Sequence, residues 1–181
     1  MAPILKLAGN IVLIGPMGAG KSTLGRLLAH ELGWPFHDSD KVIEQRTGTT
    51  IPIIFELEGE AGFRRRESEV IAELTQQHAT ILATGGGAVL AAENRRLLKA
   101  SGYVVYLHAP LKILLDRTLR DRNRPLMQTA DPAARMKQIL MEREPLYREI
   151  ADLTLETDHG SAHASVRHVL RNIGLKSRSL F

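Results

Sequence analysis

The sequence lacks cysteine, has few aromatic residues and contains no long hydrophobic run. The absence of cysteine excludes disulfides, thiol catalysis and cysteine-ligated zinc or iron–sulfur sites. The apolar runs extend to about five residues, far below the roughly 20 that a membrane-spanning helix needs. The first residues hold one lysine and no apolar stretch before a cleavage-like site, so no secretory signal is expected. These absences predict a cytoplasmic protein with no membrane partner.

The positive charge is concentrated toward the C-terminal end. The formal net charge is +4, and residues 159–181 contain four basic residues and no acidic one: Arg167, Arg171, Lys176 and Arg178. Residues 1–158 are therefore neutral. Aromatic residues make up only 4% of the chain, so no stacking platform for single-stranded nucleic acid is expected. A solvated helix and basic tail (about 174–181) explain the charge better than a nucleic-acid interface does.

Composition and periodicity predict one α/β domain over residues 1–181. The chain is 44% hydrophobic and 24% charged, which suits a single domain of this length. Short apolar runs separated by helical patterns predict five strands, at residues 10–14, 34–37, 80–83, 103–107 and 153–156. Strands that are apolar on both faces and alternate with helices are typical of a three-layer α/β/α fold with a parallel sheet. Ligands of such sheets bind beyond the carboxyl ends of the strands.

A phosphate-binding motif follows the first predicted strand. Residues 15–22 read GPMGAGKS and match G-x-x-x-x-G-K-[ST] between a strand and a helix, the context that the motif requires. Its glycines let backbone N–H groups surround phosphates, Lys21 reaches the β- and γ-phosphates, and Ser22 offers its hydroxyl to Mg²⁺. A plain glycine-rich turn at a helix start is the alternative. The agreement of motif and context favours nucleotide binding.

An acidic pair follows the second predicted strand. The strands at 80–83 and 103–107 lead into a glycine run and His108, so neither supplies the aspartate that a nucleotide hydrolase uses to help hold magnesium. We therefore expect Asp38 to contact magnesium through water and Asp40 to face a second substrate. The alternative is that Asp38 only caps the helix that follows.

Two other features point to a bound anion. Arg64 follows Phe63, whose apolar side chain suggests burial, so we expect Arg64 to turn inward. The alternative is a solvated helix face with i,i+4 pairs such as Arg65–Glu69. The glycine run at 85–87 would let a ligand approach the main chain and would expose N–H donors.

A polar loop at 120–132 is predicted to act as a mobile lid, because it contains two prolines and lacks periodicity. Four arginines lie in or beside this loop: Arg117, Arg120, Arg122 and Arg124. An arginine on a closing loop can stabilise a transferring phosphoryl group and exclude water. A solvated basic loop is the alternative. Arg143 lies near the end of the next predicted helix, where Pro145 would kink it.

Taken together, these motifs resemble the shikimate kinase family of bacterial type over residues 11–170. The matching stretches are GPMGAGKSTLGRLLA, DSDKVIEQRTG, IFELEGEAGFRRRE, ATGGGAV, RNRPLM and REPLYREIAD. The phosphate-binding motif alone is widespread, but this combination in this order is specific. The resemblance implies a fold like the nucleoside monophosphate kinases, with a five-stranded parallel sheet in the order 2-3-1-4-5. It also implies transfer of the γ-phosphate of ATP to the 3-hydroxyl of shikimate, a step toward chorismate and the aromatic amino acids.

The resemblance also implies a role for each matching residue. The nucleotide would be held by Gly18, Ala19, Gly20, Lys21, Ser22, Thr23, Arg117 and Arg124, with Arg117 stacked on adenine and Arg124 reaching the phosphates from the lid. Mg²⁺ would be held by Ser22 and, through water, by Asp38. Shikimate would be held by Asp40, Arg64, Gly85, Gly86, Gly87 and Arg143. Lys21, Asp40 and Arg124 would take part in the chemistry. No specific contact is implied for residues 157–160.

Two other functions are considered beside this one. A gluconate-type sugar-acid kinase shares the phosphate-binding motif and a polyol acid substrate, but the triple glycine and the R-x-P-L-Y stretch fit it less well. A ligand-sensing module that no longer catalyses would carry a damaged Lys21 or Asp38, and both are intact. We expect a monomer whose partners are shikimate and ATP. Whether Asp40 removes a proton or only orients the hydroxyl stays open.

Overall fold

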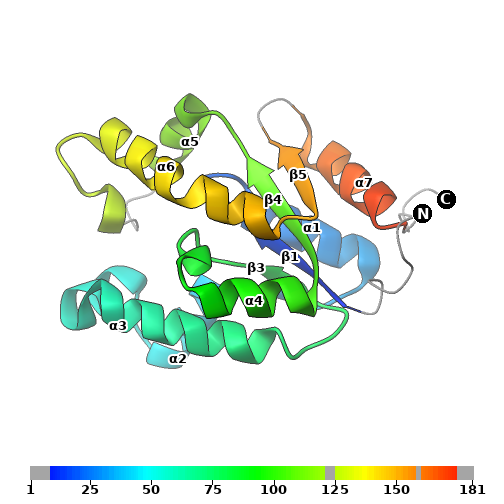
Figure 1. Ribbon diagram of the computed structural model, residues 1–181, viewed down its shortest axis with the longest axis horizontal. Coiled ribbons are helices and arrows are strands. Elements are labelled where there is room, and N and C mark those ends of the chain that lie inside the picture. Colours follow the sequence, from blue (N-terminus) through cyan, green and yellow to red (C-terminus); the bar gives the residue numbers. More distant parts are fainter. Residues whose placement is uncertain (1–8, 121–124, 158–159, 175–181) are drawn as a thin grey trace.

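The computed structural model describes residues 9–120, 125–157 and 160–174. Five parallel strands form one sheet in the order β2-β3-β1-β4-β5. They are β1 (Asn10–Ile14), β2 (Phe36–Asp38), β3 (Ile81–Ala83), β4 (Gly102–His108) and β5 (Leu153–Glu156). Helices lie on both sides of the sheet (Figure 1). The predicted three-layer fold and strand order are confirmed.

Seven α-helices are found among the described residues, and they cover the sheet. They are α1 (Lys21–Leu32), α2 (Ser39–Thr47), α3 (Ile51–Leu74), α4 (Ala92–Ser101), α5 (Leu111–Thr118), α6 (Pro132–Ile150) and α7 (Ala162–Asn172). Two short 3-10 helices, η2 (Ala88–Leu90) and η3 (Pro125–Met127), accompany them. Among the described residues, no helix combines the length and the apolar character needed to cross a membrane.

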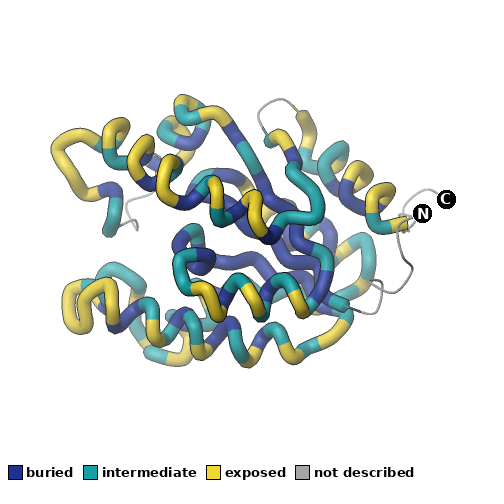
Figure 2. Tube along the Cα trace, viewed as in Figure 1, coloured by how far each residue is buried: buried dark blue, intermediate teal, exposed yellow. Residues whose placement is uncertain are grey.

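Two hydrophobic clusters lie on opposite faces of the sheet. Strand β1 is buried along its whole length, and its residues alternate between the clusters: Ile11 and Leu13 join one, while Val12 and Ile14 join the other. The first cluster includes residues of α1, α5 and α7, and the second includes residues of α2, α3 and α4. Figure 2 shows the buried strands at the centre of the molecule. The apolar run of β1 therefore reflects burial on both faces.

Helix α6 takes part in both clusters. Its first half contributes Met136 and Ile139 to the first cluster, and its second half contributes Tyr147 and Ile150 to the second. Arg143 lies between these halves, so the helix carries a charged side chain into the middle of the domain. The helix runs on to Ile150 although Pro145 lies inside it.

Three local features differ from the sequence prediction or refine it. The second strand begins at Phe36 instead of Trp34, because the Trp34 N–H donates to Ala29 O at the end of α1 and Pro35 has no N–H. Helix α3 is interrupted at Gly59, whose φ of 68° is not helical. Within the predicted lid, residues 125–127 form η3, because the side chain of Met127 packs into the core.

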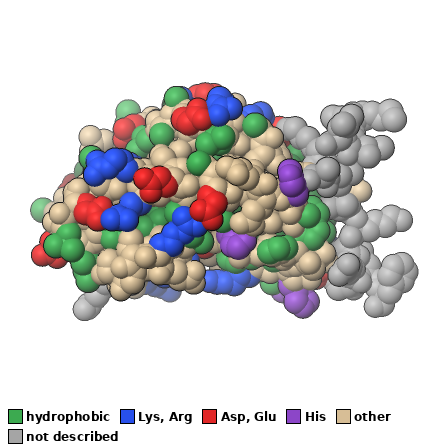
Figure 3. Space-filling view, turned by 90° about the horizontal axis from the view of Figure 1, so that it is seen from below, with side chains coloured by type: hydrophobic (Ala, Val, Ile, Leu, Met, Phe, Trp, Pro, Cys, Tyr) green, Lys and Arg blue, Asp and Glu red, His purple; other side chains and the backbone are tan. Residues whose placement is uncertain are grey.

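The outer surface has charges of both signs. Exposed ion pairs join Arg46 to Glu73 and Arg96 to Glu93. Figure 3 shows basic and acidic side chains interspersed over the face that is turned to the viewer. Mixed charges of this kind create a weaker field than a patch of one sign.

Candidate active site

The loop between β1 and α1 forms the predicted phosphate cradle. Gly15, Gly18 and Gly20 have φ angles of 143°, 79° and 94°, which favour glycine. At Gly15 a Cβ would also lie 2.6 Å from the carbonyl oxygen of Leu107. Lys21 bends back over the loop, and its Nζ donates to the carbonyl oxygens of Gly15 and Pro16 at 2.7 Å each. The lysine ammonium therefore lies inside the curve of the loop.

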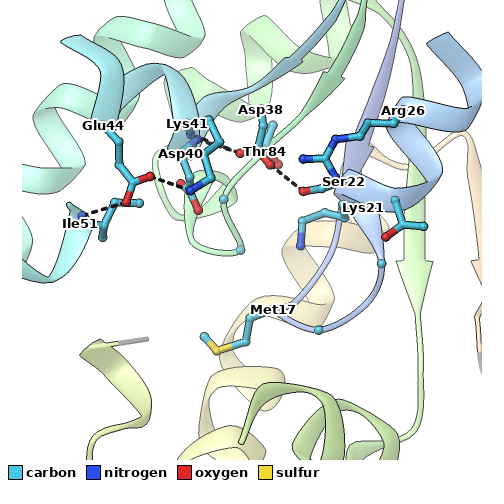
Figure 4. Close-up of a pocket in the computed structure, with 15 residues that line it drawn as sticks. Met17, Lys21, Ser22, Arg26, Asp38, Asp40, Lys41, Glu44, Ile51 and Thr84 are labelled. Atoms are coloured by element: carbon cyan, nitrogen blue, oxygen red, sulfur yellow. Dashed lines mark hydrogen bonds and ion pairs between the residues drawn. The ribbon is translucent and has the colours of Figure 1, made fainter. Parts of the chain in front are cut away.

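A cavity of about 340 Å³ opens beside this loop (Figure 4). It is lined by the phosphate loop, the start of α1, the start of α2 and the glycine run after β3. Asp38 Oδ2 accepts a hydrogen bond of 2.6 Å from Ser22 Oγ, and Asp38 Oδ1 accepts from the N–H groups of Asp40 and Lys41. Asp38 thus caps α2 with one oxygen and faces Ser22 with the other. The capping is therefore observed, and the contact of Asp38 with magnesium stays a prediction.

A second, smaller cavity adjoins the first. Its lining includes every residue that was predicted to hold the second substrate, namely Asp40, Arg64, Gly85, Gly86, Gly87 and Arg143. These residues come from α2, α3, α6 and the loop after β3. Asp40 borders both cavities, so it stands between the phosphate cradle and the two arginines. The fold therefore brings together four segments that are far apart in the sequence.

The glycine run allows these side chains to pack closely. A Cβ at Gly85 would lie 2.7 Å from Asp40 Oδ1 and 2.8 Å from Glu67 Oε1. A Cβ at Gly87 would overlap the guanidinium group of Arg64. A side chain at either position would displace charged groups of α2 and α3 from the positions that they occupy in the pocket.

Arg64 turns inward, as predicted. Its Nη1 donates to Glu67 Oε2 at 2.7 Å and its Nη2 donates to Glu60 Oε1 at 3.1 Å. Burial lowers the pKa of Arg64, but the two glutamates outweigh this and raise it above its ordinary value. The alternative of i,i+4 pairs holds in part, since Arg64 pairs with Glu60, but among the described residues no ion pair joins Arg65 to Glu69. Arg64 is held in place as a permanent cation.

Arg143 is a buried cation with only 3% of its surface exposed. Burial lowers its pKa, and the positive charge of Arg64 adds to this effect. No ion pair of Arg143 is found within the described parts of the chain, and its Nε has no hydrogen-bond partner there. Burying a cation without a carboxylate costs free energy. An anionic ligand in this cavity would compensate the charge of Arg143.

Sequence reasoning missed Glu67, which is fully buried beneath the cavity. Burial raises its pKa, while Arg64 acts in the opposite direction. Its Oε1 has no hydrogen-bond partner among the described residues. The i,i+3 spacing from Arg64 was a usable signal. The signal was not recognised because other glutamates surround Glu67 on the same helix.

A third cavity of about 280 Å³ lies on the other side of the phosphate loop. Arg117 lines it and spans its two walls, since Nη1 donates to Gly18 O at 3.1 Å and Nη2 donates to Thr157 O at 3.0 Å. Thr157 and Gly160, for which no contact was predicted, also line this cavity. Arg124, as well as Asp158 and His159, lies outside the described residues.

Comparison with known proteins identifies the family of this chain. The shikimate kinase family model matches residues 17–174. Shikimate kinase of Methylococcus capsulatus is 58% identical over 161 residues, which cover 89% of this chain and 90% of the relative. The Pseudomonas syringae pv. tomato enzyme is 57% identical over 164 residues, or 91% of this chain and 95% of the relative. The chain belongs to the shikimate kinase family.

Solved structures agree with the family assignment. Shikimate kinase from Acinetobacter baumannii, in complex with shikimate, matches with a TM-score of 0.90 and 51% identity and covers 94% of this chain and 97% of that one. A gluconokinase from Sinorhizobium meliloti matches with a TM-score of 0.61 and 17% identity, covering 93% of each chain, and shares the fold alone. As a shikimate kinase family member, the chain is a kinase with ATP as its co-substrate.

Proposed function

We propose that the chain transfers the γ-phosphate of ATP to the 3-hydroxyl of shikimate, giving shikimate 3-phosphate for chorismate and aromatic amino acid biosynthesis. The observation that carries this function is the placement of two inward-facing arginines, Arg64 and Arg143, in one cavity with Asp40. Shikimate is a small anion with one carboxylate and three hydroxyls. Arginine binds a carboxylate through its planar fork, and an aspartate accepts hydrogen bonds from hydroxyls.

On the nucleotide side, the phosphate loop holds ATP from Gly18 to Thr23. The N–H groups of the loop and of the first turn of α1 donate to phosphate oxygens, and Lys21 neutralises charge on the β- and γ-phosphates. Its present bonds to the Gly15 and Pro16 carbonyls give it a short path to this position. Arg117 stacks on adenine in the third cavity, and Arg124 approaches the phosphates from the 120–132 lid.

The residues beside the cradle fit a magnesium ion. Ser22 Oγ and Asp38 Oδ2 lie 2.6 Å apart at the start of α1, so a hydroxyl and a carboxylate face the same point. Mg²⁺ prefers such oxygen ligands and keeps several waters beside substrate phosphates. When bound, the ion would supply positive charge to the transferring group. Ser22 would bind it directly, and Asp38 would hold it through water.

On the acceptor side, Asp40 accepts a hydrogen bond from the attacking hydroxyl of shikimate. This bond orients the hydroxyl oxygen toward the γ-phosphorus. The new bond forms between that oxygen and phosphorus, the bond to the β-phosphate oxygen breaks to release ADP, and the hydroxyl proton leaves to Asp40 or to solvent. Phosphoryl transfer depends mainly on positioning and on charge stabilisation. Arg64, Arg143 and the N–H groups of the 85–87 run therefore serve catalysis by fixing shikimate in one orientation.

A coupled assay of ADP release tests the function. With shikimate we expect ADP release at least about a hundredfold faster than with gluconate, because only shikimate places a carboxylate and a hydroxyl at the two arginines and Asp40. Faster release with gluconate would make the chain a sugar-acid kinase. ATP binding without ADP release on either acid would make it a ligand-sensing module.

The remaining assignments concern the number of domains, the oligomeric state, the cellular location and the partners. We propose that residues 1–181 act as a single domain, as a cytoplasmic monomer whose partners are ATP and shikimate and not nucleic acid or membrane. Three cavities that adjoin one phosphate loop support the single domain and the monomer, since one chain provides sites for both substrates. Size-exclusion chromatography with light scattering should give a mass near 20.0 kDa. A dimer mass would overturn the monomer assignment.

A further inference from the structure

Tyr147 lies at the junction of the acceptor pocket and helix α6. It is located one turn after Arg143 on the same helix, and only 1% of its surface is exposed. Its Oη donates a hydrogen bond of 2.5 Å to the carbonyl oxygen of Gly86. The hydroxyl therefore ties the helix that carries Arg143 to the middle of the glycine run. None of the roles described above uses this residue.

The bond to Gly86 controls the direction of a peptide group. A trans peptide is planar, so fixing the Gly86 carbonyl toward α6 turns the Gly87 N–H to the opposite side. Neither the Gly86 nor the Gly87 N–H donates to an acceptor within the described ranges, whereas the Gly85 N–H is already bonded to Ser39 Oγ. These two N–H groups are available to a ligand, and Tyr147 sets the orientation of one of them.

The surroundings keep the Tyr147 hydroxyl a donor. Burial raises its pKa above the usual range, and Arg143 offsets only part of this effect. The phenol therefore stays protonated over the whole working pH range. A Cβ at Gly86 would lie 3.6 Å from Oη and 3.4 Å from the backbone N of Met17. Gly86 therefore lies between α6 and the phosphate loop. A displacement of Gly86 would change the shape of the acceptor pocket.

The ring of Tyr147 has a separate task. It stacks on Tyr106 with ring centroids 5.0 Å apart and an interplanar angle of 23°. The Tyr106 hydroxyl is also buried, but it has no hydrogen-bond partner among the described residues. Both rings therefore contribute packing. Of the two hydroxyls, the one of Tyr147 bonds to a residue of the acceptor pocket. Replacement of each tyrosine by phenylalanine separates these two contributions.

We propose that Tyr147 is a positioning residue for capture of the acceptor acid, and that its hydroxyl holds the 85–87 run and the α6 segment of Arg143 in register. This inference rests on the proposed function, because it concerns the same acceptor site. It predicts that loss of the hydroxyl weakens the binding of shikimate and leaves the binding of ATP intact.

The test compares Tyr147→Phe with Tyr106→Phe as a matched control. Y147F keeps the stacked ring, and we expect its KM for shikimate to rise about tenfold, since a buried carbonyl loses its partner, while its KM for ATP stays within about twofold. For Y106F we expect both KM values within about twofold of wild type, because the removed hydroxyl bonds to no described residue. ATP titration counts the folded sites in each variant, so partial unfolding does not obscure the shikimate affinity.

Two results would overturn the inference. An unchanged KM for shikimate in Y147F would make Tyr147 a core residue only, whatever happens to the melting temperature. An equal rise in the KM values for shikimate and ATP would mean general loosening of the site. Failure of the wild-type chain to release ADP with shikimate is a different outcome, because it rejects the proposed function itself.

Discussion

The nucleotide side and the acceptor side of this active site are built in different ways. The phosphate cradle is one continuous segment, residues 15–22, and its main binding groups are backbone N–H groups and one lysine. The acceptor pocket takes single side chains from four segments, with Asp40, Arg64 and Arg143 as its charged members. The cradle needs only local geometry and a helix start. The pocket needs the whole fold, because only packing keeps its charges close together in the interior.

The two sides also differ in burial. Thr23 and Arg117 of the nucleotide side are exposed, whereas Arg143 and Glu67 of the acceptor side are buried. Charges interact more strongly in the interior, and an unbalanced one costs more. The buried charges of the acceptor side therefore lower the free energy of unfolding, and they make the pocket selective for a small anion. Variants on the two sides should separate binding of the two substrates.

The largest effect is expected for Lys21→Ala. In the proposed function Lys21 neutralises the transferring phosphoryl group, so its loss should lower kcat by at least about a thousandfold. The fold should be unchanged, because Lys21 Nζ bonds to carbonyl oxygens of its own loop and is not part of either hydrophobic cluster. Steady-state ADP release and circular dichroism measure the two properties. Activity within about tenfold of wild type in a folded variant would refute the nucleotide-site assignment.

Arg143→Ala should have the next largest effect, and on the opposite side. Removing one partner of a buried charge pair should weaken shikimate binding by about 2–4 kcal/mol. ATP affinity without shikimate should change by less than about 1 kcal/mol, because the two sites share no direct contact through Arg143. Arg143→Lys should restore binding only in part, since an ammonium keeps the charge but loses the planar fork.

Separate titrations of each ligand into wild type and both Arg143 variants measure these effects. The comparison between the two sides would be inverted if Arg143→Ala lost ATP binding and kept shikimate binding. In that case Arg143 would belong to the nucleotide site.

Gly87→Ala tests whether the glycine run shapes the pocket. The backbone of Gly87 has φ −95°, which alanine adopts, so any effect comes from the Cβ and not from strain. That Cβ would displace the Arg64 guanidinium, and we expect a rise of about tenfold in the KM for shikimate. The KM for ATP in the same variant serves as the control. A shikimate KM equal to that of wild type would show that Arg64 has room to move.

The phosphate cradle could be predicted from the sequence as a glycine-rich loop between a strand and a helix, because the motif is contiguous and its context is readable. The nucleotide contacts of Lys21, Ser22 and Arg117 stay predictions. The lining of the third cavity by Thr157 and Gly160 was not predicted, because the loop after β5 has no motif of its own. The order of the strands followed from the family resemblance and not from periodicity, which carries no information on neighbours.

The acceptor side could be predicted from the residues only in part, through Asp40 after the second strand and Arg64 after Phe63. Arg143 looks like an ordinary surface charge in the sequence, and its burial depends on how α6 packs on the sheet. Tyr147 was missed because its partner Gly86 is brought to it by tertiary packing, whereas Glu67 was missed because other glutamates surround it on the helix that also carries its partner Arg64. The early start assigned to β2 failed because Trp34 closes α1 instead of pairing in the sheet. Local patterns therefore find elements and cradles, and packing decides which buried charges meet.

The smallest effect is expected for Ser161→Ala, which sharpens the comparison on the nucleotide side. Ser161 caps α7 by accepting a hydrogen bond from the Ala164 N–H, and Ala162 and Ser165 of this helix line the third cavity. Loss of the cap should lower the free energy of unfolding by about 1 kcal/mol. Fraying of this helix end should raise the KM for ATP by less than about threefold and leave that for shikimate unchanged, since α7 takes no part in the acceptor pocket. Urea unfolding and the two KM values measure this, and a selective rise in the KM for shikimate would mean that the two sides are coupled through the sheet.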